Sequence, residues 1–256
     1  MSTVEVEDLR TKVRSVYHEV AERPDGEFHF EMGRPLAQRL GYPAEELDGV
    51  PEEAIASFAG VGYHLHLAEI SEGDTVLDIG SGSGMDSFLA ARKVGSSGRV
   101  IGVDMTEAQL AKAERLRADH GFMSNSFVAG YAEDLPVEAG SVDVVISNGV
   151  INLAADKQRV FDEIARALRP GGRMAIADIV TEKQLTDDIV RDSSLWAACI
   201  GGAAQEASYL GMIEAAGLVV RSVEENREYA FLSGSAQGAT ARFGVKSVSI
   251  SAQKPA

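Results

Sequence analysis

The sequence predicts an α/β fold, a doubly wound sheet with helices on both faces and a helical cap before it. Three observations predict it. From Ser71 onward, short apolar stretches alternate with segments of helical periodicity, which is the pattern of an open sheet. One stretch, Thr75–Ile79, runs through a glycine-rich turn into a helical segment. The composition, 256 residues with 45% hydrophobic and 25% charged residues, suits one globular domain with a small appendage.

The first 70 residues are expected to be mainly helical. Val4–Ala21 carries valine and leucine at three- and four-residue spacing, which predicts an amphipathic helix. Pro24-Asp25-Gly26 ends it. A short helix through Leu40 and two further helical pieces before Gly60 would cap the core. We therefore expect a cap or substrate lid over residues 1–70 and a sheet domain over residues 71–256.

The sheet domain is expected to contain seven strands. The last two alternate in polarity and are consistent with an antiparallel pair. Pro170-Gly171-Gly172 predicts a helix stop and a turn before the fifth strand. The expected strands are Thr75–Ile79, Val100–Val103, Ser126–Ala129, Val142–Ser147, Arg173–Asp178, Leu218–Glu224 and Val245–Ala252. The main expected helices are Glu107–His120, Lys157–Leu168, Gln184–Ala198 and Ser208–Ala216.

The glycine-rich turn after the first strand predicts a ligand site. Gly80, Gly82 and Gly84 let the backbone turn sharply and approach a ligand, and the helix that follows offers free N–H groups and its positive dipole end. A dinucleotide fingerprint, GxGxxG, would require glycine where Met85 stands. The glycines alone therefore predict a polar or anionic ligand without identifying it.

Asp104 narrows the choice of ligand. It ends the second predicted strand, 20 residues after Gly84. A carboxylate at this place can accept both hydrogen bonds of a ribose diol. The alternative is an ordinary strand-end aspartate that caps the helix beginning near Glu107.

With these motifs the sequence resembles the class I S-adenosylmethionine-dependent methyltransferases. The resemblance is carried by VLDIGSGSG (76–84), Asp104, SNGVINL (147–153) and LRPGGRMAIADIV (168–180). It implies a Rossmann-like, seven-stranded sheet whose last strand is antiparallel, with S-adenosylmethionine (SAM) as cofactor and S-adenosylhomocysteine (SAH) as product. Residues 71–180 would form the cofactor half, and residues 181–256 a substrate-side insertion and the final strands. More narrowly, Leu40 to Val180 is similar to the arsenite methyltransferases and to the ubiquinone/menaquinone C-methyltransferases.

The resemblance also implies cofactor-binding residues. Where the family usually has an acidic residue that reads adenine, this chain has Tyr131, so that side-chain contact is not expected. Met105 would pack on adenine or in the core, and Tyr17 would reach the methionine part or serve packing. The residues implied to bind the cofactor are Asp78, Gly80, Ser81, Gly82, Gly84, Asp104, Met105, Ala132, Glu133, Asn148 and Tyr17.

The acceptor expected first is a small organic molecule, such as one of secondary metabolism, methylated at O, N or C. Arsenite methyltransferases hold arsenic with thiolates, and their cysteines align here with Val61, Gly149 and Cys199, so two of the three thiols are missing. The alternatives are methylation of arsenite or another metalloid, and a protein that binds the cofactor without transferring methyl. His29, Glu31 and His64 are candidate bases or substrate contacts, although a lone histidine is more often a surface or hydrogen-bonded residue.

Charge and composition limit the partners. A net charge of −15 disfavours nucleic acid and anionic membranes, and leaves a small-molecule acceptor. There is one cysteine, the N-terminal residues lack a signal-peptide pattern, and no apolar run could span a bilayer. We therefore expect a cytoplasmic monomer or homodimer without a metal.

Overall fold

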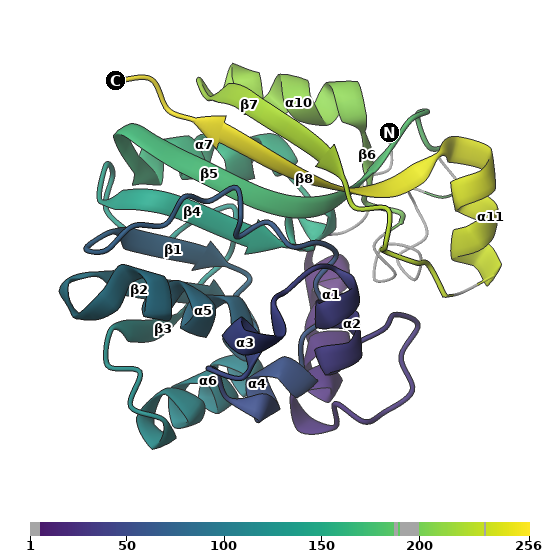
Figure 1. Ribbon diagram of the computed structural model, residues 1–256. Helices are drawn as coiled ribbons and strands as arrows, with labels where there is room; N and C mark the ends of the chain where they lie inside the picture. The colour runs from purple at the N-terminus through teal and green to yellow at the C-terminus, as the bar shows by residue number, and fades with distance from the viewer. Residues whose placement is uncertain (1–5, 187–188, 190–199, 233) are drawn as a thin grey trace.

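A single mixed sheet forms the centre of the computed structural model, which describes residues 6–186, 189, 200–232 and 234–256. Its strand order is β3-β2-β1-β4-β5-β8-β7, with the two-residue β6 paired to β5 (Figure 1). The strands are β1 Thr75–Ile79, β2 Arg99–Asp104, β3 Asn125–Ala129, β4 Val142–Asn148, β5 Leu168–Thr181, β6 Ala204–Gln205, β7 Val219–Glu225 and β8 Val245–Gln253.

Strand direction confirms the predicted topology. β1 to β5 are parallel to one another, and the chain order reverses between β1 and β4. β8 lies antiparallel between β5 and β7, with Ile250 opposite Ile176 on one side and Val223 on the other. Because all parallel strands end at the same side, the residues that follow β1, β2 and β4 meet there.

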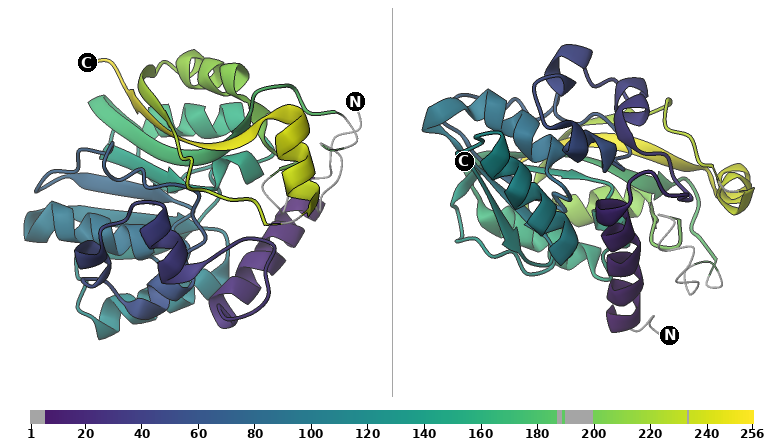
Figure 2. Two further views of the ribbon diagram at one scale, coloured as in Figure 1. Left: turned by 45° about the vertical axis from the view of Figure 1, so that its right-hand side comes forward. Right: turned by 90° about the horizontal axis from the view of Figure 1, so that it is seen from below.

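Helices cover both faces of the sheet (Figure 2). On one face, α5 (Met85–Val94) and α6 (Glu107–Asp119) pack on β1, β2 and β3. On the other, α7 (Lys157–Ala167) and α10 (Glu206–Ala215) pack against each other and on β5. Each face has its own buried apolar cluster, so the sheet is covered on both sides as its apolar strands require.

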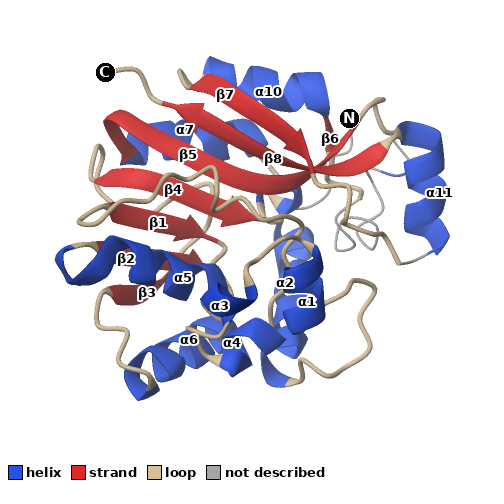
Figure 3. Ribbon diagram, viewed as in Figure 1, coloured by secondary structure: helices blue, strands red, loops and turns tan. Residues whose placement is uncertain are grey.

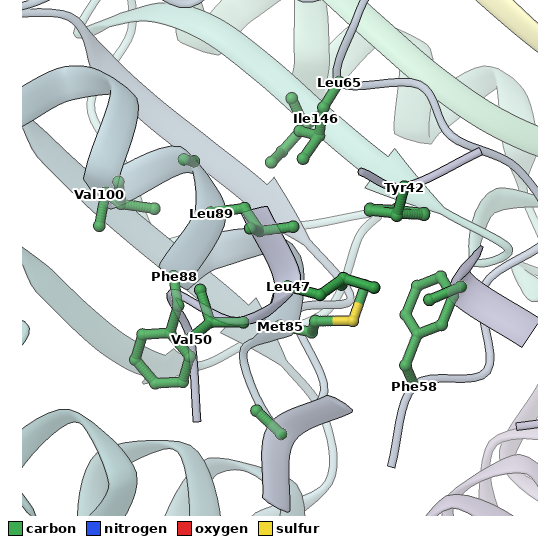
Figure 4. Close-up of a cluster of buried hydrophobic side chains, with 14 of the residues drawn as sticks. Tyr42, Leu47, Val50, Phe58, Leu65, Met85, Phe88, Leu89, Val100 and Ile146 are labelled. Carbon is green, nitrogen blue, oxygen red and sulfur yellow. The ribbon is translucent and has the colours of Figure 1, made fainter. Parts of the chain in front are cut away.

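The N-terminal helices add a layer at the α5 face. They are α1 (Val6–Glu22), α2 (Gly33–Arg39), α3 (Ala44–Leu47) and α4 (Glu52–Ala56) (Figure 3). Leu47 and Phe58 from this layer bury their side chains in one cluster with Met85 and Leu89 of α5 (Figure 4). None of the helices that the structure describes is long and apolar enough to cross a membrane.

Three elements differ from the expectations. β5 begins directly after α7 and carries a register shift at Pro170–Gly172, where a turn was expected; Pro170 has no N–H, and Gly171 has a φ of +76°. The sheet gains β6 as an eighth strand. A helix, α11 (Gly234–Phe243), was not expected between the last two long strands. Most of the expected helix 184–198 lies outside the described residues.

Candidate functional site

The glycine turn between β1 and α5 forms the floor of a pocket at the carboxyl ends of the parallel strands. Gly80 has a φ of +72°, and a Cβ there would lie 2.2 Å from a methyl carbon of Val150. Gly84 has a φ of +95°, and a Cβ there would meet rings of Phe88 and Phe127 at 2.9 and 3.0 Å. Both positions therefore require glycine for backbone conformation and for space.

Asp104, at the end of β2, faces this turn. Its Oδ2 accepts a hydrogen bond from the Gly82 N–H at 3.0 Å, and its Oδ1 accepts one from the Thr106 N–H at 2.8 Å. Residue Thr106, not Asp104, occupies the N-cap position of α6. The carboxylate therefore lies between the glycine turn and the helix start, and it lines the pocket.

Two further carboxylates are buried at the same pocket. Asp78 accepts a hydrogen bond from the Ser87 hydroxyl at 2.6 Å, and Asp86 accepts one from the Tyr42 hydroxyl at 2.7 Å. Burial, followed by the charge of Asp86, raises the pKa of Asp78 to about 8, and burial raises the pKa of Asp86 to about 6. A cation entering the pocket would favour the ionised forms of both groups.

Asn148, at the end of β4, connects the pocket to the N-terminal layer. Its Oδ1 accepts the Val61 N–H at 2.8 Å, and its Nδ2 lies 2.9 Å from the Gly62 carbonyl oxygen. The same Nδ2 lies 3.1 Å from the Tyr42 hydroxyl and 3.2 Å from Asp86 Oδ2. The side chain of Asn148 thus fixes the chain at residues 61 and 62 beside the sheet, in addition to lining the pocket.

Helix α1 forms the opposite wall. Leu9, Arg10, Val13 and Tyr17 line the pocket from α1. The Tyr17 ring stacks on Phe30, with 6.1 Å between ring centroids. Ten of the eleven residues implied to bind the cofactor line this one pocket, the exception being Gly84. The lining also includes residues that the sequence did not single out, among them Arg10, Asp86, Thr106, Gln109 and Leu153.

The three candidate bases do not line the pocket. His64 is fully buried, and desolvation lowers its pKa to about 3. Glu31 forms an ion pair with Arg39. His29 packs edge-on against Phe30, with 4.6 Å between ring centroids. The structure therefore does not bring these side chains to the glycine turn, and their catalytic role stays a prediction. No group of three acidic, histidine or cysteine side chains within the described ranges could hold a metal ion.

Two of the positions aligned with arsenic-binding cysteines are neighbours. A Cβ on Gly149 would lie 3.3 Å from Cγ1 of Val61. Val61 belongs to an apolar cluster that joins α1, β5, β8 and α11, whereas Cys199 lies outside the described residues. The buried members of this cluster are Leu9, Val13, Val61, Leu153, Ala177, Ile179, Leu185, Ile200, Ala203, Ala239, Phe243 and Val245.

Comparison with known proteins identifies the family. The model of the methyltransferase domain matches residues 70–217, which contain the glycine turn, Asp104 and Asn148. The chain belongs to the S-adenosylmethionine-dependent methyltransferases. The expected Rossmann-like fold and the expected cofactor of this methyltransferase are thereby confirmed.

Named relatives in this methyltransferase family act on arsenic. The chain is 44% identical over 181 residues to an arsenite methyltransferase of Halobacterium salinarum, covering 71% of this chain and 46% of that protein. It is 39% identical over 180 residues to the human arsenite methyltransferase, covering 66% and 46%. The chain thus spans about half the length of the curated relatives it matches.

Solved methyltransferase structures have the same fold. An arsenic(III) SAM methyltransferase from Chlamydomonas reinhardtii superimposes with a TM-score of 0.65 at 30% identity, over 88% of this chain and 75% of that one. A geranyl diphosphate C-methyltransferase from Streptomyces coelicolor, solved with SAH, reaches a TM-score of 0.69 at 18% identity, over 96% and 98%. The second likeness shows the fold alone.

The pocket fits this cofactor. Ser81 Oγ is buried in the pocket wall without a hydrogen-bond partner among the described residues, so it has hydrogen-bonding capacity to offer. Asp104 lines the pocket beside the glycine turn, and a carboxylate can accept hydrogen bonds from a ribose diol. The carboxyl groups of Asp78 and Asp86 suit a ligand with positive charge.

Proposed function

We propose that this methyltransferase transfers a methyl group from SAM to a small acceptor that binds near Gly149. The observation that carries the proposal is the placement of Asp104 opposite the glycine turn, 3.0 Å from the Gly82 nitrogen. When bound, SAM supplies a methyl group already activated by its sulfonium. The chain has to bind the two reactants and align them, which can contribute roughly 7–11 kcal/mol.

We assign the cofactor contacts as follows. Asp104 accepts hydrogen bonds from the ribose hydroxyls, and the turn at Gly80 and Gly82 admits the cofactor close to the backbone. Met105 and the segment 131–133 flank the adenine. Asp78 and Asp86 face the positively charged end. Residues 1–70 act as the lid and residues 71–256 as the domain that holds the cofactor.

Trivalent arsenic is the first candidate acceptor. The names of the relatives support it better than the organic acceptor that we expected first. Because Val61 and Gly149 supply no thiol, the arsenic would have to arrive with small thiols such as glutathione as its soft ligands. It would then lie beside Gly149, which lines the pocket and neighbours the buried Val61.

A small organic acceptor is the second candidate. The specific observation that favours it is the apolar part of the pocket wall, formed by Leu9, Val13 and Leu153. Such a wall stabilises an uncharged, apolar group through its burial. An acceptor that must lose a proton would also need a base, for which the described pocket offers Asp78 or Asp86.

The test is SAH release, measured with arsenite and glutathione in one reaction and with a host metabolite extract in another. Release only in the reaction with arsenite and glutathione, with methylated arsenic detected by mass spectrometry, would support the first candidate. Release with the extract alone would support the second and would yield the acceptor. Tight SAM binding without release in either reaction would contradict methyl transfer.

A further inference from the structure

Tyr131 lies where α1 meets the pocket wall that follows β3. Its ring is covered by the guanidinium of Arg10, whose Cζ lies 4.3 Å from the ring centroid. Its hydroxyl accepts a hydrogen bond from Nη2 of Arg14 at 3.0 Å. Arg10 also approaches the Glu133 carboxylate, at 3.7 Å between Nη2 and Oε1. Two arginines one helical turn apart thus hold one tyrosine and the acid beside it.

The two halves of α1 are attached differently. The C-terminal half is bonded to α6 and to the N-terminal layer through backbone carbonyls: Gln109 donates to Tyr17 and Lys112 to Ala21, at 2.9 and 3.1 Å. In the N-terminal half, Arg10 and Arg14 make polar contacts with Tyr131 and Glu133 of the segment that follows β3. Beneath this half, Leu9, Arg10 and Val13 line the pocket.

We propose that Arg10, Arg14, Tyr131 and Glu133 form a clasp that closes α1 over the cofactor and sets how slowly SAM and SAH leave. The proposal rests on the proposed cofactor binding of the same pocket. Arg10, Tyr131 and Glu133 line the pocket themselves, so the clasp stands directly at the ligand. A cation held over an aromatic ring in a partly buried place is stronger than an exposed ion pair. Arg10 and Arg14 are positioning residues, since they act through α1, whereas Tyr131 and Glu133 belong to the segment that flanks the adenine.

The experiment measures the dissociation rate of radiolabelled SAH from the full chain. Arg10→Met removes both the ring contact and the approach to Glu133, and Tyr131→Leu removes the ring. We expect each to accelerate release about tenfold. Tyr131→Phe keeps the ring beneath Arg10 and loses the bond from Arg14, so a smaller acceleration of about threefold is expected.

The matched control is Arg242→Met in α11. Arg242 also lies over a ring, 5.0 Å from the centroid of Phe243, but it does not line the pocket. Salt gives a second readout, because the approach of Arg10 to Glu133 is screened by ions. Raising ionic strength should accelerate release from the wild type more than from Arg10→Met, and ligand-free unfolding temperatures should stay close to one another.

The outcomes separate the clasp from the proposed function. If Arg10→Met and Tyr131→Leu release SAH no faster than Arg242→Met, while the wild type binds SAH, the clasp is wrong and the proposed function stands. If the wild type binds neither SAM nor SAH, the proposed function fails and the clasp fails with it. The expected result is faster release in both variants, together with a smaller acceleration by salt in Arg10→Met than in the wild type.

Discussion

Replacing Asp104 by alanine tests the cofactor site most directly. The carboxylate oxygens accept backbone N–H groups, among them those of Gly82 at 3.0 Å and Thr106 at 2.8 Å. A carboxylate oxygen can accept more than one hydrogen bond, so we expect the carboxylate to accept hydrogen bonds from a ribose diol in the pocket. Hydrogen bonds to a charged group contribute about 1.5–3 kcal/mol each.

We expect Asp104→Ala to weaken SAH binding by about 3 kcal/mol, or roughly 150-fold in Kd, since water replaces part of what is lost. The variant also leaves two backbone N–H groups without their acceptor, which costs about 1–3 kcal/mol of stability. Calorimetric titration measures the affinity, and thermal unfolding without ligand measures the stability separately.

Asp119→Ala is the matched control for this change. It removes an aspartate at the other end of α6, whose side chain is 59% exposed. It should leave SAH affinity unchanged. A folded Asp104→Ala variant that binds SAH within a factor of about two of the wild type would refute the ribose assignment.

Three further predictions concern the rest of the pocket. Val61→Cys with Gly149→Cys should raise arsenite-dependent SAH release when glutathione is limiting, despite about 1–2 kcal/mol of strain from the positive φ of Gly149. The control pair Val61→Ser, Gly149→Ser should not raise it. A folded cysteine variant without this gain would contradict the placement of arsenic beside these two residues. Asn148→Leu leaves buried donors and acceptors without partners and should lower the free energy of unfolding by about 3 kcal/mol, measured by urea denaturation; a loss below about 1 kcal/mol would speak against the connection to the N-terminal layer. The pKa of Asp78 in the folded chain, about 8, lies above its ordinary value of 3.8, so the stability that this group contributes is present at low pH and is lost as the pH rises from 3.8 to about 8. Asp78→Asn should flatten this fall in the free energy of unfolding. An unchanged pH dependence would contradict the raised pKa of Asp78.

The sheet could be predicted from the sequence because its signals are local. Each strand from β1 to β4 is a short apolar run between turn residues, and the glycine turn and Asp104 are adjacent to their strands along the chain. Parallel strands end at one edge, so proximity in the sheet follows from sequence position. This reasoning brought the implied cofactor residues other than Gly84 to the lining of one pocket.

Contacts between distant segments could not be predicted in the same way. The partners of Asn148 come from residue 42, residues 61–62 and residue 86, and no spacing rule connects them. Tyr131 was noted as a departure from the family pattern, but its partners Arg10 and Arg14 looked like the polar face of an amphipathic helix. The candidate bases failed to reach the pocket for a related reason, since nothing in the sequence fixes the direction of a side chain in a loop.

Helix α11 escaped prediction because its own sequence is a poor helix former. Gly234 and Gly238 lie within it and weaken helical propensity. The helix is stabilised instead by burial of Ala239 and Phe243 in the apolar cluster shared with α1. Tertiary packing decided its conformation, which is the usual way in which a weak local preference is overridden.

The hydrogen bonds of Asn148 with residues 61 and 62 have a consequence for how this region can evolve. Asn148 holds residues 61 and 62 through the N–H of one and the carbonyl oxygen of the other, not through their side chains. Backbone atoms are the same in every residue, so a substitution at position 61 can leave both hydrogen bonds in place. The limit on position 61 comes instead from the apolar cluster in which Val61 is buried, so the side chain there can change within that cluster while the chain stays attached to the cofactor half.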